Sequence, residues 1–336
     1  MSSSLPSVSP GDVEGLDLQP VLEEVERRLR KQVQSSSPFV EQAARHLIDA
    51  GGKRFRPTLV VLCSHLGDPL GPRIPDAGVV VELVHLATLY HDDVIDEATA
   101  RRGADSANLR WDNTVAILTG DFLFARASEL SADLGVEVTR IMAQTIAILC
   151  EGQIQEVQGS RGALPSDLPP LEPTFDHYLD VVAQKTASLV ATACRLGTLL
   201  AGCAPDRVET ATRFGWNLGM AFQLSDDILD ITSDAAESGK TPGTDLREGV
   251  RTIPVLYALE EDPDGELADL LDTDAMSERS VARALELLRN GPALDRARQH
   301  AARYAEDAIR RLDGFEESAA TRALRRLARF TVTRSS

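Results

Sequence analysis

The chain has few cysteines and few aromatic residues. Only four of its 336 residues are cysteines, and 4% are aromatic. The cysteines, Cys63, Cys150, Cys194 and Cys203, form no CxxC pair, and a chain of this length does not depend on disulfides to fold. We therefore expect reduced core thiols and a cytoplasmic protein.

Positive charge is also scarce. Lys and Arg number 35 against 52 Asp and Glu, which gives a net charge of −17. A nucleic-acid partner requires a basic surface that neutralises phosphates, so this deficit argues against one. It also argues against docking on an anionic membrane by charge alone.

No segment predicts an integral membrane span. Residues 1–15 are rich in Ser, Pro and Gly and lack the basic start and apolar run of a signal peptide. The most apolar stretch, residues 186–204, carries Arg195 near its centre. A charge there costs at least ~2.5–3.5 kcal/mol on membrane insertion, so we expect a buried core helix instead.

Apolar residues recur at three- and four-residue spacing almost throughout, as in Val21, Leu22, Val25 and Leu29. No run of alternating strands is evident. Pro- and Gly-rich segments predict loops at residues 160–174, 232–249 and 262–265, but none separates regions of different composition. The sequence therefore predicts an all-α protein, with a flexible tail over residues 1–15 and a single-domain helical bundle over residues 16–336.

Two aspartate clusters share the spacing i, i+1 and i+4. They are Asp92, Asp93 and Asp96, and Asp226, Asp227 and Asp230. On a helix this spacing gathers three carboxylates within about one turn, where they repel one another unless a cation binds them. A single cluster is often a solvated acidic face, but two clusters with apolar neighbours predict a site for Mg²⁺, which usually keeps phosphate oxygens in its shell.

Basic residues flank these clusters. They are Lys53, Arg54, Arg56, Arg101, Arg102, Lys185 and Lys240. Arg can grip a diphosphate through two hydrogen bonds, and Lys supplies a point charge. Each taken singly is as readily an ordinary surface cation, but together, in so acidic a chain, they predict a diphosphate substrate.

Five motifs follow one another in a familiar order. They are residues 51–57, Asp92–Asp96 with Arg101-Arg102-Gly103, Lys185-Thr186, Phe222-Gln223 with Asp226–Asp230, and Gly239-Lys240 with Gly243-Thr244-Asp245. Gly120-Asp121 and Gly152-Gln153 fit the same pattern. The chain thus resembles the trans-type isoprenyl (polyprenyl) diphosphate synthases. The resemblance implies an all-α bundle with a deep central cavity, usually a homodimer, whose two aspartate clusters face each other across the mouth and bind several Mg²⁺ ions.

The resemblance also implies residue roles. All six aspartates would be metal ligands. Isopentenyl diphosphate would contact Lys53, Arg56, His85 and Arg102. The allylic diphosphate would contact Arg101, Lys185 and Lys240, while Thr186 and Gln223 would stabilise the carbocation. The reaction would be Mg²⁺-assisted ionisation, condensation and proton loss. In one departure, Val250 stands where the family usually has Lys, and the next residue, Arg251, can take over that charge.

Product length in such enzymes depends on residues below the first cluster. These are Val81, Val84, Ala87 and Thr88. Short-chain enzymes typically place an aromatic residue near Ala87 or Thr88. Ala87 lies ~7–8 Å and Val81 ~16 Å from Asp92 along a helix, against roughly 5 Å per isoprene unit. The pattern favours a medium- or long-chain product, a quinone side-chain precursor. The alternative is a short-chain farnesyl or geranylgeranyl diphosphate synthase with a floor near Phe122, Phe124 or Met142.

Other enzyme classes fit less well. A class I terpene cyclase would normally replace the second aspartate cluster with an Asn/Ser/Glu pattern and line its pocket with aromatic side chains, and head-to-head condensing enzymes lack the element at residues 51–57. A phosphohydrolase built on His91-Asp92 needs further histidine ligands. Regulatory subunits of heteromeric synthases usually lose their aspartates, so only an active subunit of a heteromer stays open.

The C-terminal segment, residues 322–334, is basic and amphipathic. Leu324, Leu327 and Phe330 lie on one side of the predicted helix. We expect a packed final helix rather than a membrane contact.

Overall fold

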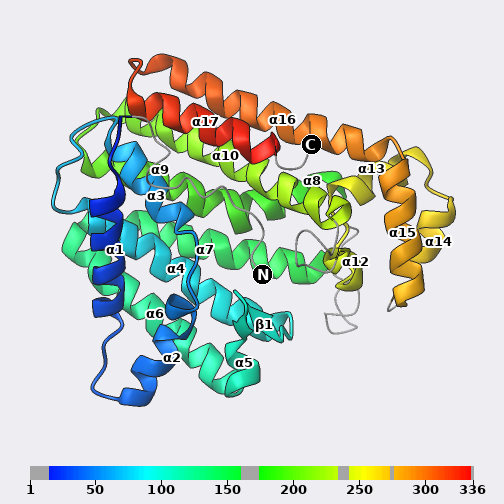
Figure 1. The fold of residues 1–336 in the computed structure, drawn as a ribbon, viewed down its shortest axis with the longest axis horizontal. Helices are drawn as coiled ribbons and strands as arrows, with labels where there is room; N and C mark the ends of the chain where they lie inside the picture. The colour runs from blue at the N-terminus through cyan, green and yellow to red at the C-terminus, as the bar shows by residue number, and fades with distance from the viewer. Residues whose placement is uncertain (1–14, 160–173, 234–241, 273–275, 334–336) are drawn as a thin grey trace. The chain divides into compact units, whose positions relative to one another are not determined.

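The structure is a computed structural model that describes residues 15–159, 174–233, 242–272 and 276–333. Most of these residues lie in helices, which confirms the predicted all-α class (Figure 1). In chain order the elements are α1 (Gln19–Gln32), α2 (Pro38–Asp49), α3 (Phe55–Ser64), α4 (Ile74–Ile95), β1 (Ala100–Arg101), β2 (Ala104–Asp105), α5 (Ala107–Arg110), α6 (Asn113–Leu134), α7 (Val136–Gly159), α8 (Phe175–Val182), the π-helix η1 (Ala183–Ala187), α9 (Ser188–Leu200), α10 (Pro205–Thr232), α12 (Thr244–Arg247), α13 (Ile253–Glu261), α14 (Glu266–Leu271), α15 (Glu278–Asn290), α16 (Ala293–Arg311), the 3₁₀-helix η2 (Leu312–Gly314) and α17 (Ala319–Thr333).

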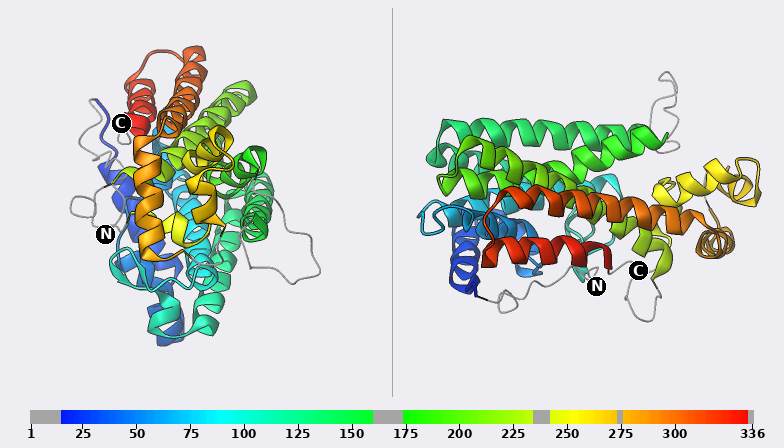
Figure 2. Two further views of the ribbon diagram at one scale, coloured as in Figure 1. Left: turned by 90° about the vertical axis from the view of Figure 1, so that its right-hand side faces the viewer. Right: turned by 90° about the horizontal axis from the view of Figure 1, so that it is seen from above.

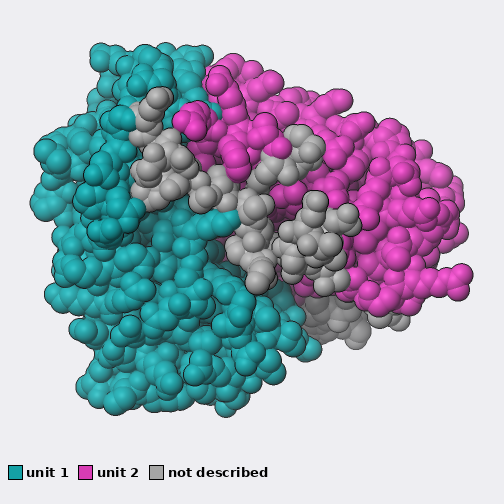
Figure 3. All heavy atoms as spheres, in the orientation of Figure 1, with its two compact units in different colours: residues 1–146, 189–215, 311–325 teal, residues 147–188, 216–310, 326–336 magenta. Residues whose placement is uncertain are grey.

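The chain divides into two compact units, which Figure 3 colours separately. Unit 1 comprises Met1–Ile146, Leu189–Gly215 and Arg311–Arg325, and unit 2 comprises Ala147–Ser188, Trp216–Arg310 and Arg326–Ser336. Each unit has its own buried apolar residues. The single domain expected over residues 16–336 stays a prediction.

Helix α4 lies at the centre of unit 1 and is buried on nearly all sides. Its sequence is apolar all round, which is typical of a helix inside a core rather than on a surface. It packs against α1, α3 and α6. It ends at Ile95 with Asp96 as its C-cap, so the first aspartate cluster lies at the C-terminal end of a buried helix.

A two-stranded antiparallel hairpin follows α4. Ala100 pairs with Asp105 and Arg101 with Ala104, which leaves Arg102 and Gly103 as the turn. Both turn residues have positive φ, 56° and 79°, as a type I′ hairpin requires. Arg102 therefore occupies a conformation that a non-glycine residue rarely adopts.

Unit 2 is built around the C-terminal part of α10. Buried residues of α8, α10, α13, α15 and α16 form one apolar cluster. Helices α14 and α15 lie beside each other at one end of the unit (Figure 2). Helix α10 ends at Thr232, so the second aspartate cluster also lies in the last turns of a helix.

Several local predictions are confirmed. Helix α2 ends just before Gly51, residues 262–265 connect α13 to α14, and the apolar stretch around Arg195 forms the largely buried helix α9. No described helix is long and apolar enough to cross a membrane.

Three expectations need correction. Of the four cysteines expected in the core, only Cys63 and Cys194 are buried, whereas Cys150 is exposed and Cys203 is half-buried. The loop predicted at residues 232–249 contains the short helix α12, and residues 234–241 lie outside the described part. In α17, Leu324 and Leu327 are buried as predicted, but Phe330 is 46% exposed because it falls on the outer edge of the helix. Of the predicted Pro-rich loop, residues 160–173 lie outside the described part.

Candidate active site

A buried cluster of charges in unit 1 surrounds Glu82, a side chain that is only 2% exposed. Arg54 pairs with Glu82 at 3.0 Å and with Glu26 through a shorter contact. The same guanidinium donates to the backbone carbonyls of Ile48 and Gly51. Arg54 therefore binds within the protein on all sides, and it stabilises the loop that follows α2.

Arg102 reaches the same cluster from the hairpin. Its guanidinium donates to the carbonyls of Leu47 and Gly51 and lies 3.7 Å from Glu82. A Cβ on Gly52 would lie 2.8 Å from Arg102 Nη1, so glycine at this position makes room for the arginine. The strained turn and the glycine together direct Arg102 inward.

Arg56 and His85, two of the predicted isopentenyl diphosphate ligands, lie beside these groups. Burial lowers the pKa of Arg56 to about 10, against the opposing effect of Glu82, so the side chain stays charged at neutral pH. Its buried Nε has no hydrogen-bond partner. Burial, reinforced by the neighbouring arginines, lowers the pKa of His85 well below its usual value, so the imidazole is neutral. Lys53 is half-buried in the loop before α3.

The three aspartates of the first cluster differ in their exposure to solvent. Asp93 is completely buried, and its Oδ1 accepts a hydrogen bond from Arg101 Nε at 2.6 Å. Burial raises the pKa of Asp93, and Arg101 opposes this rise. Its second oxygen, Oδ2, is buried without a partner. Asp92 is half-buried and Asp96 is exposed.

The predicted chain-length residues lie along α4 below this cluster. Val81, Val84 and Ala87 are fully buried. Thr88 is half-buried, and its hydroxyl donates to the carbonyl of His85 at 2.8 Å. No aromatic residue stands at any of these positions.

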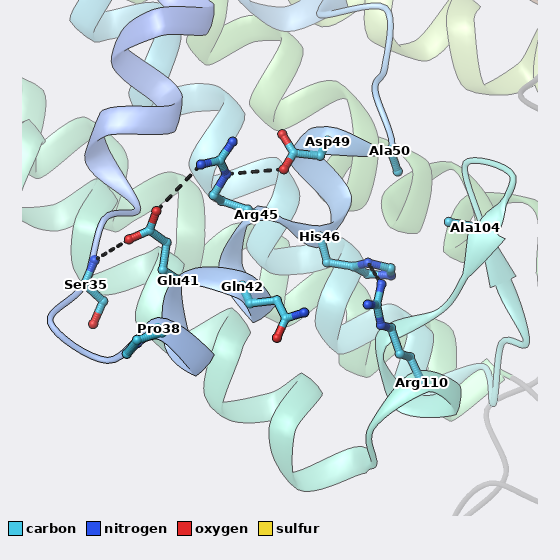
Figure 4. A pocket seen from close by; sticks show the side chains of 10 residues that line it. All are labelled: Ser35, Pro38, Glu41, Gln42, Arg45, His46, Asp49, Ala50, Ala104 and Arg110. Carbon is cyan, nitrogen blue, oxygen red and sulfur yellow. Dashed lines mark hydrogen bonds and ion pairs between the residues drawn. The ribbon is translucent and has the colours of Figure 1, made fainter.

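A cavity of about 630 Å³ lies elsewhere in unit 1, lined by residues of α2, α5 and the hairpin (Figure 4). Its polar side chains contact each other: Arg45 forms an ion pair with Asp49, and the Arg110 guanidinium donates to His46 Nδ1. None of the predicted site residues lines it. We do not assign it a catalytic role.

In unit 2, Asp227 of the second aspartate cluster is held by two neutral donors. Tyr178 donates to its Oδ2, and Gln223 Nε2 donates to its Oδ1 at 2.8 Å. Gln223 Oε1 in turn accepts from the hydroxyl of Thr186 at 2.8 Å. Burial raises the pKa of Asp227 to about 7, and the hydrogen bonds from Tyr178 and Gln223 oppose the rise.

Asp230 of the same cluster binds the Gly-Thr-Asp element. Its two carboxylate oxygens accept from the backbone amides of Thr244 and Asp245, each at 3.2 Å. Burial and the neighbouring Asp227 and Asp230 raise the pKa of Asp245 well above its usual value. A carboxylate oxygen can accept more than one hydrogen bond, so the contacts of Asp230 with these two amides are compatible with a further ligand. Asp226 is half-buried.

The π-helix η1 carries the other predicted residues of unit 2, and π-turns are frequent at functional sites. Lys185 Nζ pairs with Glu156 of α7. One turn earlier on α7, a Cβ on Gly152 would lie 2.9 Å from the backbone nitrogen of Lys185. Glycine at this position thus allows α7 and η1 to touch. Lys240 lies outside the described residues.

The sequence prediction missed several residues that organise the site. They are Glu82, Glu156 and Tyr178, together with Asp245, which the sequence placed in a motif but to which it gave no role. Glu82 gave a signal, because it is the one charge inside an apolar run of α4. Tyr178 stands two helical turns before Lys185, and nothing in the sequence marks Tyr178 as part of the site.

Comparison with known proteins identifies the family of the chain. Residues 37–288 match the polyprenyl synthetase family. The nonaprenyl diphosphate synthase of Mycobacterium tuberculosis is 45% identical over 92% of this chain and 91% of the relative. Component 2 of the heptaprenyl diphosphate synthase of Geobacillus stearothermophilus is 37% identical over 90% of this chain and 92% of that protein.

A solved structure is similar over the full length. It is a polyprenyl synthase from Caulobacter crescentus complexed with calcium and isoprenyl diphosphate, with a TM-score of 0.87, 33% identity, and coverage of 100% of this chain and 99% of that chain. The fold and the two aspartate-bearing helices define an isoprenoid synthase, which is a transferase of prenyl groups. The chain belongs to the polyprenyl synthetase family.

Proposed function

We propose that this enzyme adds isopentenyl diphosphate units to an allylic diphosphate and releases a medium- or long-chain all-trans polyprenyl diphosphate, with Mg²⁺ as its cofactor. The observation that carries the proposal is the cation cluster of unit 1. Arg54 is saturated by protein partners, whereas the buried Nε of Arg56 has none. A buried donor without a partner costs about 1–3 kcal/mol, and more when charged, so the site favours an anionic ligand such as a diphosphate.

The donor set fits a hard divalent cation. Both clusters consist of carboxylates at the C-terminal end of a helix, where the helix dipole is negative, and neither α4 nor α10 has a basic residue in its last turn. Within the described residues no three His, Cys, Asp or Glu side chains already surround one point. Mg²⁺ needs only one or two carboxylates, because substrate phosphates complete its shell. The calcium in the Caulobacter crescentus structure supports this assignment.

The six aspartates of the two clusters would hold the metal. When bound, Mg²⁺ draws negative charge onto the leaving diphosphate. Arg101 and Lys185 bind the allylic diphosphate, and Lys53, Arg56, His85 and Arg102 bind isopentenyl diphosphate. The neutral imidazole of His85 donates one hydrogen bond without adding charge. The oxygen atoms of Thr186 and Gln223 would stabilise the carbocation, and buried surroundings would exclude water from it.

Product length follows from α4. Because Val81, Val84 and Ala87 carry small side chains, no bulky group stops the growing chain along about 16 Å of this helix. The nonaprenyl product named for the Mycobacterium tuberculosis relative agrees with a long chain.

We also propose a homodimer. Helix α6 of unit 1 exposes Ile117 (43%) and Leu118 (60%) near its start, and Val136, just beyond its C-terminal end, is 77% exposed. A second copy of this chain would bury them. The competing arrangement is a heteromer, as the name of the Geobacillus stearothermophilus component implies.

Product analysis tests the proposal. The purified protein is incubated with Mg²⁺, labelled isopentenyl diphosphate and farnesyl diphosphate, and the dephosphorylated products are resolved by chromatography. We expect a ladder that ends well beyond geranylgeraniol and that disappears in excess chelator. Products that stop at geranylgeraniol would overturn the chain-length assignment. If no primer supports condensation, the proposal that this chain is active without a different partner subunit is wrong.

A further inference from the structure

Tyr178 contacts the second aspartate cluster although no motif marks it. It belongs to α8, is 7% exposed and donates its hydroxyl hydrogen to Asp227 Oδ2. Its ring lies in the apolar cluster of unit 2 together with Leu224 and Ile228, the residues that flank Asp227 on α10. The phenol therefore has little freedom to leave the carboxylate.

The same segment of chain reaches Asp227 by a second route. Helix α8 continues directly into η1, where Thr186 donates to Gln223, and Gln223 donates to Asp227 Oδ1 from one turn earlier on α10. In this series of two hydrogen bonds, each donor lies on the side away from the Asp227 carboxylate and donates toward it. Both oxygens of Asp227 are thus fixed by groups that α8 and η1 position.

The chemical type of the donors is informative. Asp93, in the first cluster, pairs with a guanidinium, which neutralises its charge. Tyr178 and Gln223 are neutral, so they orient Asp227 and leave its negative charge available to a cation. Hydrogen-bonded partners of this kind typically change metal affinity or activity about 10- to 100-fold when removed.

We infer that Tyr178 is a positioning residue for the second aspartate cluster: its phenol holds the Asp227 carboxylate in one orientation and ties the metal site to the segment that carries Lys185 and Thr186. This inference rests on the proposed function. It extends that function, because it assigns the geometry of the second metal site to a residue of α8.

The test compares Tyr178→Phe with Tyr304→Phe. Both substitutions remove one hydroxyl from a tyrosine of unit 2, but Tyr304 stacks on His300 and is not part of the proposed site. Two assays are used. The condensation assay gives kcat, the KM for isopentenyl diphosphate and the Mg²⁺ concentration for half-maximal activity. The second assay needs no turnover and measures the rise in melting temperature on titrating Mg²⁺ in the presence of inorganic pyrophosphate.

For Tyr178→Phe we expect the Mg²⁺ requirement to rise about 10-fold or more in both measurements and kcat to fall about 10- to 100-fold. The KM for isopentenyl diphosphate should stay within about twofold, since neither Tyr178 nor Asp227 is among its predicted ligands. Tyr304→Phe should match the wild type. A Mg²⁺ response within twofold of the wild type in a folded Tyr178→Phe variant would overturn the inference.

Two further experiments distinguish a positioning role of Tyr178 from a purely structural one. In an Asp227→Asn background, Tyr178→Phe should add little, because the two residues act through one carboxylate. If Tyr178→Phe does not fold, Tyr178→His retains a ring donor and should keep a Mg²⁺ requirement closer to that of the wild type than Tyr178→Leu does; equal requirements would contradict the positioning role. Wild-type protein that neither condenses substrates nor responds to Mg²⁺ would instead refute the proposed function.

Discussion

Replacing Gly152 by alanine should displace the segment that carries Lys185 and Thr186. An added Cβ would lie 2.8 Å from Gln184 Cβ, 2.9 Å from Lys185 N and 3.2 Å from Gln184 C, whereas ordinary contact begins near 3.4 Å. Two of these atoms are backbone, so no side-chain rotation relieves the clash. Helix α7 and η1 must separate by roughly 0.6 Å, the difference between ordinary contact and the shortest of these distances.

The magnitudes follow from two opposing terms. Alanine favours a helix over glycine by about 1 kcal/mol, while overpacking costs about 1–3 kcal/mol, so the net loss of folding stability is about 0–2 kcal/mol. A misplacement of about 1 Å can cost about 100-fold in rate, so we expect kcat to fall by about 10- to 100-fold. Activity should therefore fall far more than the population of folded protein does.

The assay is condensation of labelled isopentenyl diphosphate, with the melting temperature measured by circular dichroism on the same samples. Gly159→Ala on the same helix is the matched control, because its Cβ would meet the ring of His177, which can rotate away. We expect the control to stay within about twofold of the wild type. A Gly152→Ala enzyme with wild-type kcat would refute the argument, as would a loss explained entirely by unfolding at the assay temperature.

Three further predictions concern unit 1 and the metal. Asp92→Ala and Asp226→Ala should each lower kcat at least about 100-fold in the condensation assay, and near wild-type rates for both would contradict the metal assignment. Ala87→Phe should shorten the product, and it should cost about 1–3 kcal/mol of stability because the position is fully buried. An unchanged product ladder from a folded variant would show that α4 does not limit product length. The depressed pKa of His85 means that below its ordinary value of 6.5 the unfolded chain binds a proton that the native protein does not, so stability is lost as the pH falls. Urea unfolding at pH 7 and pH 5 should show a smaller loss for His85→Gln than for the wild type, and equal losses would count against a buried neutral imidazole.

Much of the fold could be predicted from the sequence because helices are local. Periodicity and the glycine stop located α2 correctly, and the Ala-, Leu- and Arg-rich segments form α15 and α16. The spacing i, i+1 and i+4 placed both aspartate clusters on helices, and the structure confirms this for all of them except Asp96, which is the C-cap of α4. Phe330 was misplaced because a helical period gives the angle between residues but not the width of the face that neighbouring helices cover.

The contacts between elements were beyond such reasoning. Tyr178 and Asp227 are 49 positions apart, and only the packing of α8 on α10 brings them together. The sequence also could not show that Arg54 and Arg56 have different hydrogen-bond partners, since both are cations in one short motif. Resemblance assigned Arg56 to the substrate, and the structure supplies a physical reason, because Arg54 already binds two glutamates and two carbonyls.

Equal spacing in the two aspartate clusters conceals different electrostatics. In the first cluster, the middle carboxylate, Asp93, is neutralised by Arg101, which the hairpin delivers from outside the helix. In the second, the middle carboxylate, Asp227, has only neutral donors, and Asp245 adds a further acidic group nearby. Without a cation, the repulsion is therefore greater in the second cluster, although the sequence pattern is the same. Because opposite charge within a few ångströms favours the ionised form of a carboxylate, we expect a divalent cation to stabilise the second cluster more than the first. We therefore expect the residues that surround each aspartate, more than the motif itself, to determine how strongly each cluster depends on metal.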